Sequence, residues 1–278
     1  IHRDEAEAIF AINNVLTDPD AAWVDFFVEA IGEFVLNGTE PRLMCDDNEA
    51  KWLIAQIDHD GQIDSMAELE ALVRIVERAQ NVPEKLKNYA LEQIEKEVLT
   101  GTGPTRCGGE LSDTHISEAE CKLLRRLIFA SGGHGTAAVS RFDAEMLFRL
   151  KDATKDDANA PEWADLFVDG VANYLKGFHL AHAQISHDRA KELHAFIADN
   201  KASVGRFMGK VVREIPNTAN NLGVVFGKKA ASTDYAADAA AGKIVTDQEG
   251  AWLQAMIDDD GEVDAIEKRL IQRIAEEG

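Results

Sequence analysis

The sequence predicts an all-α protein. Apolar residues recur along most of the chain at the three- and four-residue spacing of amphipathic helices, and the alternating pattern of strands is scarce. Two such stripes are Leu69, Leu72, Val73 and Val76, followed by Leu86, Tyr89, Ala90, Ile94 and Val98. Blocks of this helical pattern also occur twice, which predicts a duplicated helical unit.

Three blocks carry the duplication, in the same order in both copies. IHRDEAEAIFAI at the start matches VSRFDAEMLFRL from Val139, and AWVDFFVEAIGEFVLNG matches EWADLFVDGVANYLKG. The third block, EAKWLIAQIDHDGQID, matches EGAWLQAMIDDDGEVD. Each copy is therefore predicted as three helices, an acidic turn and a further helix. One copy occupies residues 1–80 and the other residues 139–278.

The predicted organisation is a first helical unit at residues 1–100, a linker at 101–115 and a second unit at 116–278. GTGPTRCGGELSDTH forms the linker because it is rich in turn-forming residues. The second unit carries a helical insertion at residues 178–246. ISEAECKLLRRLIF resembles the block before the acidic turn, with an acid-poor turn at Ser131–Gly135. By that comparison Ile1 lies in the second half of a similar block, so we expect further sequence upstream.

Composition narrows the class of protein. The formal charge of −21 argues against nucleic acid as a partner. Three widely separated cysteines predict no disulfide framework and favour a reducing compartment such as the cytoplasm. No apolar run approaches the roughly 18 residues of a membrane span.

The acidic turns are candidate Ca²⁺ or Mg²⁺ sites. When Gly61 and Gly261 are placed at the sixth position of an EF-hand loop, acids fall at several ligand positions. The candidate ligands are Asp58, Asp60, Asp64 and Glu68 in the first turn, and Asp258, Asp260, Asp264 and Glu267 in the second. Position 1 is Gln56 or Met256, so neither turn is a standard loop, and the second is the better candidate.

The same residues also fit helix caps. Asp64 and Asp264 each precede a helix and are good N-caps, and Asp264 and Glu267 have the spacing of a capping box. Gly61 and Gly261 would close the preceding helices in the left-handed conformation. Capping leaves carboxylates crowded in each turn, so the cation site and the structural turn both remain open.

The pattern E-A-x-W-L-x(3)-I-D-x-D-G-x-[IV]-D, followed by an apolar helix, resembles the TerB-like tellurite-resistance family and its relatives at the N-terminus of DjlA-type co-chaperones. The layout around GPTRCGGEL and ISEAECKLLRRL also resembles a group of bacterial repeat proteins of uncharacterised function. The TerB-like resemblance covers about half of the chain. It implies an all-helical, non-catalytic module of stress-response and membrane-associated assemblies, with divalent cations bound through the acids of these turns.

The insertion contains a basic amphipathic helix at residues 204–215. Its apolar residues fall on one helical face, and Arg206, Lys210 and Arg213 fall on the opposite face. Such a helix docks on an anionic membrane or on an acidic partner surface, or packs its apolar face on its own protein.

No nucleophile elbow, zincin motif or dinucleotide fingerprint occurs in the sequence. We therefore expect a non-enzymatic helical interaction or scaffold module of the TerB-like type, modulated by a divalent cation at the acidic turns. The alternatives are a calcium-binding sensor or buffer and, third, a peripheral membrane adaptor that uses the helix at 204–215. The sequence does not identify a protein partner.

Overall fold

The structure is a computed structural model that describes residues 1–58, 61, 63–106, 115–130, 139–175, 247–257 and 263–277. These residues form helices, with no β-strand among them, which confirms the all-α prediction. The elements are α1 (Arg3–Asn13), α2 (Ala21–Asn37), α3 (Asp47–Ile57), α4 (Met66–Arg78), α5 (Glu84–Thr100), the 3₁₀ turn η1 (Pro104–Arg106), α6 (Glu118–Ile128), α7 (Arg141–Ala153), α8 (Trp163–Leu175), α13 (Asp247–Ile257) and α14 (Ala265–Glu277).

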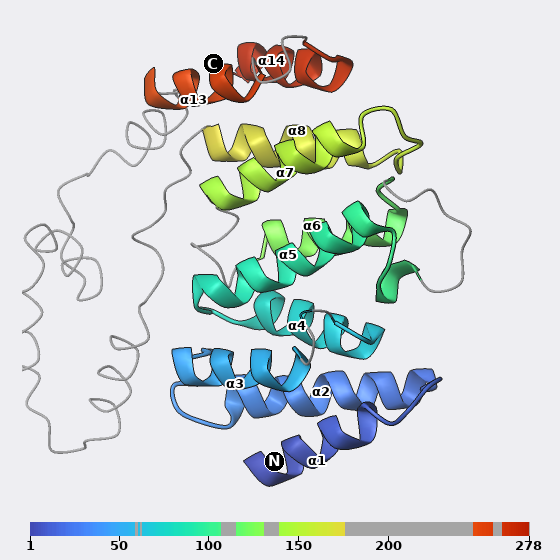
Figure 1. The fold of residues 1–278 in the computed structure, drawn as a ribbon. Helices are drawn as coiled ribbons and strands as arrows, with labels where there is room; N and C mark the ends of the chain where they lie inside the picture. Colours follow the sequence, from blue (N-terminus) through green and yellow to red (C-terminus); the bar gives the residue numbers. More distant parts are fainter. Residues whose placement is uncertain are drawn as a thin grey trace, which may run out of the picture.

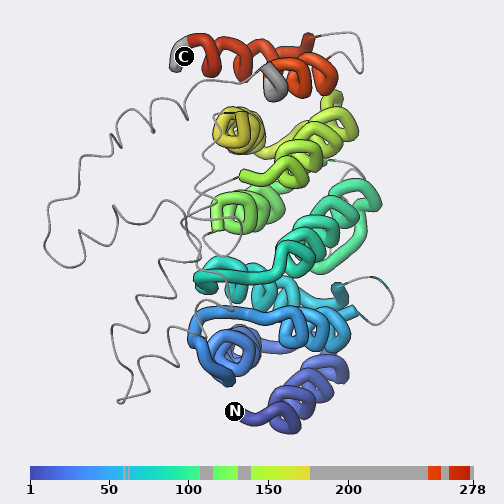
Figure 2. Tube along the Cα trace, turned by 90° about the vertical axis from the view of Figure 1, so that its left-hand side faces the viewer, coloured from blue at the N-terminus to red at the C-terminus, as the bar shows by residue number. Residues whose placement is uncertain are grey.

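The helices form an elongated stack with the N-terminus at one end and the C-terminus at the other (Figures 1 and 2). One row contains α2, α4, α6, α8 and α14, each packed against the next. The second row contains α1, α3, α5, α7 and α13, in which α5 packs against both α3 and α7. The order of helices along the stack therefore follows the order in the sequence.

Capping boxes start several of these helices. In α4, α6 and α7 the side chains of Ser65, Ser117 and Ser140 accept the third backbone N–H of the helix. The acidic residue at that third position bonds in return to the backbone N–H of the serine. Each box satisfies two backbone donors that the helix leaves unpaired, so the sequence fixes where these helices begin.

The hydrophobic core is continuous among the described residues, from Ala6 in α1 to Leu270 in α14. The predicted stripe in α4 is buried, as are the aliphatic residues of the stripe in α5. Lys87 joins α5 to Asp143 of α7 across the predicted boundary between the two units. The two predicted units thus share one core where they meet.

A cluster of four aromatic rings occurs twice. In the first copy Phe10 lies edge-on to Phe27 and Trp52, with ring centroids 5.1 and 5.9 Å away. In the second copy Phe148 lies edge-on to Phe167 and Trp252, at 5.0 and 5.8 Å. The fourth ring contacts the tryptophan at 4.7 Å in both copies, from Phe34 in the first and Tyr174 in the second. The repeated sequence blocks align each ring of the first copy with the corresponding ring of the second.

Ion pairs follow the row that begins with α2. Arg78 of α4 pairs with Glu29 of α2 at 3.0 Å, and Arg126 of α6 pairs with Glu70 of α4 at 2.7 Å. The series continues with pairs between Arg125 and Asp169 and between Arg269 and Asp165, which join α6 to α8 and α8 to α14. Most of these side chains are exposed, so each pair contributes roughly 0–1 kcal/mol.

Candidate functional site

The first acidic turn is built around Asp58 and Gly61. Asp58 Oδ1 accepts the backbone N–H of Gly61 at 2.6 Å, and Gly61 has a positive φ of 87°. Its carbonyl oxygen accepts a hydrogen bond from Lys96 of α5 at 2.7 Å. Asp60, another predicted ligand, lies outside the described residues. Helix α3 already ends at Ile57, so Gly61 shapes the turn and does not close the helix.

The predicted N-cap of α4 is wrong by one residue. Ser65, not Asp64, caps this helix, and Asp64 is exposed. The Ser65 hydroxyl accepts the Glu68 N–H at 3.2 Å, and Glu68 Oε2 accepts the Ser65 N–H at 3.1 Å. Glu68 is buried, and its Oε1 accepts a hydrogen bond from Asn13 of α1 at 3.3 Å. Glu68 therefore points into the protein, and Asp64 points to solvent.

In the second turn Asp264 and Glu267 form the predicted capping box. Glu267 N–H donates to Asp264 Oδ1 at 2.8 Å, and Asp264 N–H donates to Glu267 Oε2 at 2.9 Å. The buried ammonium of Lys151, from α7, donates to Glu267 Oε1 at 2.6 Å and to Asp264 Oδ2 at 3.0 Å. The other two predicted ligands, Asp258 and Asp260, lie outside the described residues.

Burial works against the charged form of Lys151, but hydrogen bonds to Asp152, Glu267 and Asp264 outweigh it and raise the pKa of the lysine. Lys151 is therefore a cation at neutral pH, bound to two of the predicted calcium ligands. A divalent ion that used both of these carboxylates would share them with this ammonium or displace it.

The two turns differ in length. A gap-free comparison of the sequences pairs Asp64 with Asp264. The structure pairs Ser65 with Asp264 and Glu68 with Glu267, because these residues form the capping boxes of α4 and α14. Asn13 occupies in α1 the position of Lys151 in α7, and each contacts the acid of the corresponding box. Both copies have this contact, although the donor is the uncharged amide of Asn13 in the first and the ammonium of Lys151 in the second.

Two further buried acids belong to a capping box and also bind a side chain from another element. Asp143, the third residue of α7, accepts a hydrogen bond from Lys87 at 2.7 Å. Glu120, the third residue of α6, accepts two from Arg106, at 2.7 and 2.9 Å. We call Glu68, Glu120, Asp143 and Glu267 the buried capping acids. Sequence reasoning missed the basic partners of Glu120, Asp143 and Glu267, although an acid three residues after Ser or Asp at a helix start signals the box itself.

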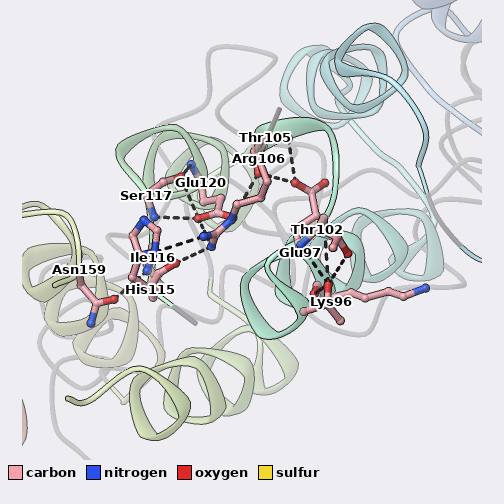
Figure 3. Close-up of polar contacts among 11 residues, drawn as sticks. Lys96, Glu97, Thr102, Thr105, Arg106, His115, Ile116, Ser117, Glu120 and Asn159 are labelled. Atoms are coloured by element: carbon pink, nitrogen blue, oxygen red, sulfur yellow. Dashed lines mark hydrogen bonds and ion pairs between the residues drawn. The ribbon is translucent and has the colours of Figure 1, made fainter. Parts of the chain in front are cut away.

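The predicted linker begins with a polar cluster between α5 and α6, shown in Figure 3. Glu97 of α5 accepts hydrogen bonds from the backbone N–H and the hydroxyl of Thr105. The same hydroxyl lies 3.2 Å from Glu120 Oε1. Gly103 passes so close to Glu97 that a β-carbon there would collide with its side chain. Residues 103–106 are thus held against both helices.

This cluster contains two buried carboxyl groups and one guanidinium. Arg106 forms a two-pronged pair with Glu120 and leaves Glu97 without a direct ion pair among the described residues. Burial raises the pKa of Glu97, and the hydrogen bonds from Thr105 only partly offset it. Arg106 also donates to the carbonyl oxygen of His115, so it connects the first part of the predicted linker to its last residue.

Cys45 and Cys121 are buried free thiols. Burial raises the pKa of Cys121 to about 11 and that of Cys45 further. A nucleophilic cysteine needs a lowered pKa, so these two thiols act as core residues. Cys107 lies outside the described residues.

A polar pocket of about 230 Å³ lies between α8 and α14. Its lining residues are Asp165, Val168, Asp169, Arg269, Gln272 and Arg273. Arg269 pairs with Asp165, and Asp169 pairs with Arg125 at 3.5 Å. Asp165, Asp169 and Arg269 of its wall are thus engaged in ion pairs that belong to the packing of the row.

Within the described part of the chain, no group of three or more His, Cys, Asp or Glu side chains is arranged to hold a metal ion. Because Asp60, Asp258 and Asp260 are outside that part, the predicted cation sites stay predictions. The predicted basic helix at residues 204–215, with Arg206, Lys210 and Arg213, also lies outside it. None of the described helices has the length and apolar character to cross a membrane.

A comparison of the chain with protein-family models, with curated proteins and with solved structures finds no match in any of the three.

Proposed function

We propose that this protein is a helical interaction scaffold, built from two tandem copies of a TerB-like unit and modulated by a divalent cation at its acidic turns. The observation that carries the proposal is the continuous core shared by two copies of the same ring cluster. Stacked helical units of this kind contact only their neighbours and leave long surfaces for partners.

The buried ion pairs support a rigid scaffold. Lys87 fixes α5 to the start of α7, and Lys151 fixes α7 to the start of α14. A buried charge pair of this kind holds one geometry, because any other arrangement leaves a charge without its partner. A rigid stack meets a partner without first losing conformational entropy.

The scaffold is tested by affinity capture with the intact chain, followed by titration of each captured protein in purified form. We expect saturable binding with a fixed stoichiometry. The control is a chain with reversed charges at the exposed Arg78 and Glu29, which alters the charge pattern on the surface of α2 and α4. If no purified protein binds the intact chain saturably, the scaffold proposal is wrong.

A cation sensor or buffer is the second candidate function. It is favoured by the first turn, where Asp58 folds back on Gly61 and Asp64 remains in solvent. Calorimetric titration of Ca²⁺ and Mg²⁺ into chelator-treated protein tests it. The sensor predicts that Asp258→Ala with Asp260→Ala lowers the melting temperature only when calcium is present. Absence of binding heat and of any melting shift at millimolar ion would exclude it.

A peripheral membrane adaptor is the third candidate and rests on the sequence of residues 204–215. Flotation with vesicles of neutral or anionic lipid tests it. The adaptor requires binding to anionic vesicles that is lost when Arg206, Lys210 and Arg213 are changed to glutamine.

A further inference from the structure

Thr105 lies between two buried acids that belong to different helices (Figure 3). Its hydroxyl contacts Oε2 of Glu97 from α5 and lies 3.2 Å from Oε1 of Glu120 from α6. A hydroxyl carries a single hydrogen, so it can donate to only one of these two oxygens. The other contact becomes a hydrogen bond only when the acid on that side carries a proton. Both hydrogen bonds together therefore need one bound proton.

Glu120 is the acid whose charge is already matched within the cluster. Its oxygens accept hydrogen bonds from Arg106 Nε and Nη2 at 2.7 and 2.9 Å. Ser117 adds its backbone N–H and its hydroxyl, each at 2.8 Å from Glu120 Oε2. The one guanidinium of the cluster is thus committed to Glu120.

Glu97 is the acid without an ion pair among the described residues. Its side chain belongs to a residue that is only 4% exposed, and Oε2 makes both of its contacts with Thr105. Glu97 Oε1 is buried and has no hydrogen-bond partner in the described part of the chain. An unpaired oxygen costs less in a neutral carboxylic acid than in a buried carboxylate. Glu97 is therefore the better place for the proton.

The charges around Glu97 agree with this assignment. Burial is the largest influence and raises the pKa of Glu97; Glu120 of α6 raises it further, and Arg106 of η1 lowers it. Lys96, the neighbour of Glu97 on α5, donates to the carbonyl oxygen of Gly61. On the other helices that pack on α5, charged side chains form pairs elsewhere: Asp47 with Lys85, Glu70 with Arg126, Asp143 with Lys87, and Arg149 with Glu95.

We propose that Glu97 holds a proton in the folded protein and donates it to the Thr105 hydroxyl, which donates in turn to Glu120, so that residues 103–106 form a proton-operated latch between α5 and α6. The latch is closed while the proton is bound. Release of the proton to solvent leaves two carboxylates on one hydroxyl hydrogen and a buried charge without a partner. Residues 103–106 then separate from α5. The Thr105 N–H, which donates to Glu97 Oε2 at 3.0 Å, reports that separation.

The test measures hydrogen exchange of the Thr105 amide by NMR against pH, corrected for the intrinsic exchange rate. In the open latch Glu97 has its ordinary pKa of 4.5, and in the closed latch its pKa is raised. The protection is therefore expected to be full below pH 4.5. Between pH 4.5 and the raised pKa it falls by about tenfold for each pH unit, the slope for one proton.

Glu97→Gln is expected to make the protection of Thr105 independent of pH. The amide oxygen still accepts the Thr105 N–H, and the side chain no longer titrates. The matched control is Glu118→Gln, because Glu118 is an exposed acid of α6 that pairs with Lys122. This control is expected to keep the pH dependence of the unmodified chain.

Infrared difference spectroscopy between the unmodified chain and Glu97→Gln reads the proton directly. Just above pH 4.5, the difference spectrum is expected to contain the carbonyl band of a neutral carboxylic acid. Absence of this band would overturn the proposal, and so would a pH dependence at Thr105 that survives Glu97→Gln. An equal loss of protection in α2 would show that the whole protein unfolds, which would also overturn the latch. None of these outcomes involves a partner, so they are independent of the scaffold proposal.

Discussion

Replacement of Lys87 by methionine is expected to destabilise the protein strongly. Its ammonium lies 2.7 Å from the Asp143 carboxylate, and the two side chains are 2% and 0% exposed. At that distance the attraction between unit charges is about 6 kcal/mol for an effective dielectric constant near 20. Desolvation of both groups offsets much of this in the native protein. Loss of one partner nevertheless costs about 3–5 kcal/mol, because it leaves the other charge buried and unpaired.

The measurement is urea denaturation followed by circular dichroism and tryptophan fluorescence, in parallel. Methionine keeps the length and apolar stem of lysine, so the loss of free energy reports the charge more than the packing. The matched control is Lys122→Met, because Lys122 forms an exposed pair with Glu118 on α6. That change is expected to lower the free energy of unfolding far less than Lys87→Met does, because solvent screens an exposed pair.

Addition of Asp143→Asn to Lys87→Met is expected to recover part of the loss. The amide oxygen still accepts the Ser140 N–H, and the unpaired charge is gone. A double-mutant cycle then isolates the coupling between the two residues. The reasoning is refuted if Lys87→Met costs no more than Lys122→Met, or if the double variant is as unstable as the sum of the two single variants.

Three further changes test other parts of the structure. Ser65→Ala is expected to lower the free energy of unfolding by about 0.5–2 kcal/mol, because Ser65 caps α4. Asp64→Ala is expected to lower it by less, and both are measured by thermal unfolding. Equal effects of the two changes would contradict Ser65 as the cap. Glu97→Gln is expected to stabilise the protein increasingly as pH rises above 4.5, the ordinary pKa of this carboxyl group. Burial raises the pKa of Glu97, so the native state favours the protonated acid, and that stability is present below pH 4.5 and lost as pH rises through the raised pKa. A pH-independent difference in urea midpoints between Glu97→Gln and the unmodified chain would refute this. Gly61→Ala is expected to cost about 1 kcal/mol in the same denaturation experiment, because φ is 87° there. The atom of the described chain nearest to an added β-carbon, apart from its chain neighbours, is Lys96 Nζ at 3.9 Å. A neutral effect of Gly61→Ala would show that the turn relaxes.

The sequence predicted the helices and much of their burial from local information. Leu69, Leu72 and Val73 recur at the helical spacing and are buried in the structure, because one face of an amphipathic helix must leave water. The capping box of Asp264 and Glu267 could be read in the same way, since both residues belong to one helix turn. The cap of α4 was misassigned because Asp64 and Ser65 are adjacent and both residue types cap helices well.

The tertiary structure decided which side chains contact the acids of the capping boxes. The sequence identifies Glu267 and Glu120 only as acids in the first turn of a helix. In the structure Glu267 is buried against Lys151, and Glu120 is buried against Arg106. The cation that meets Glu267 lies more than one hundred residues away in the chain, so no local pattern reports it. The sequence alone therefore determined the all-helical class, the capping box of Asp264 and Glu267 and the repeated blocks, which depend on hydrogen bonds and hydrophobic periodicity within short segments. The partners of the buried charges depend on how the rows of helices stack, because only the folded chain brings these distant side chains within hydrogen-bond distance.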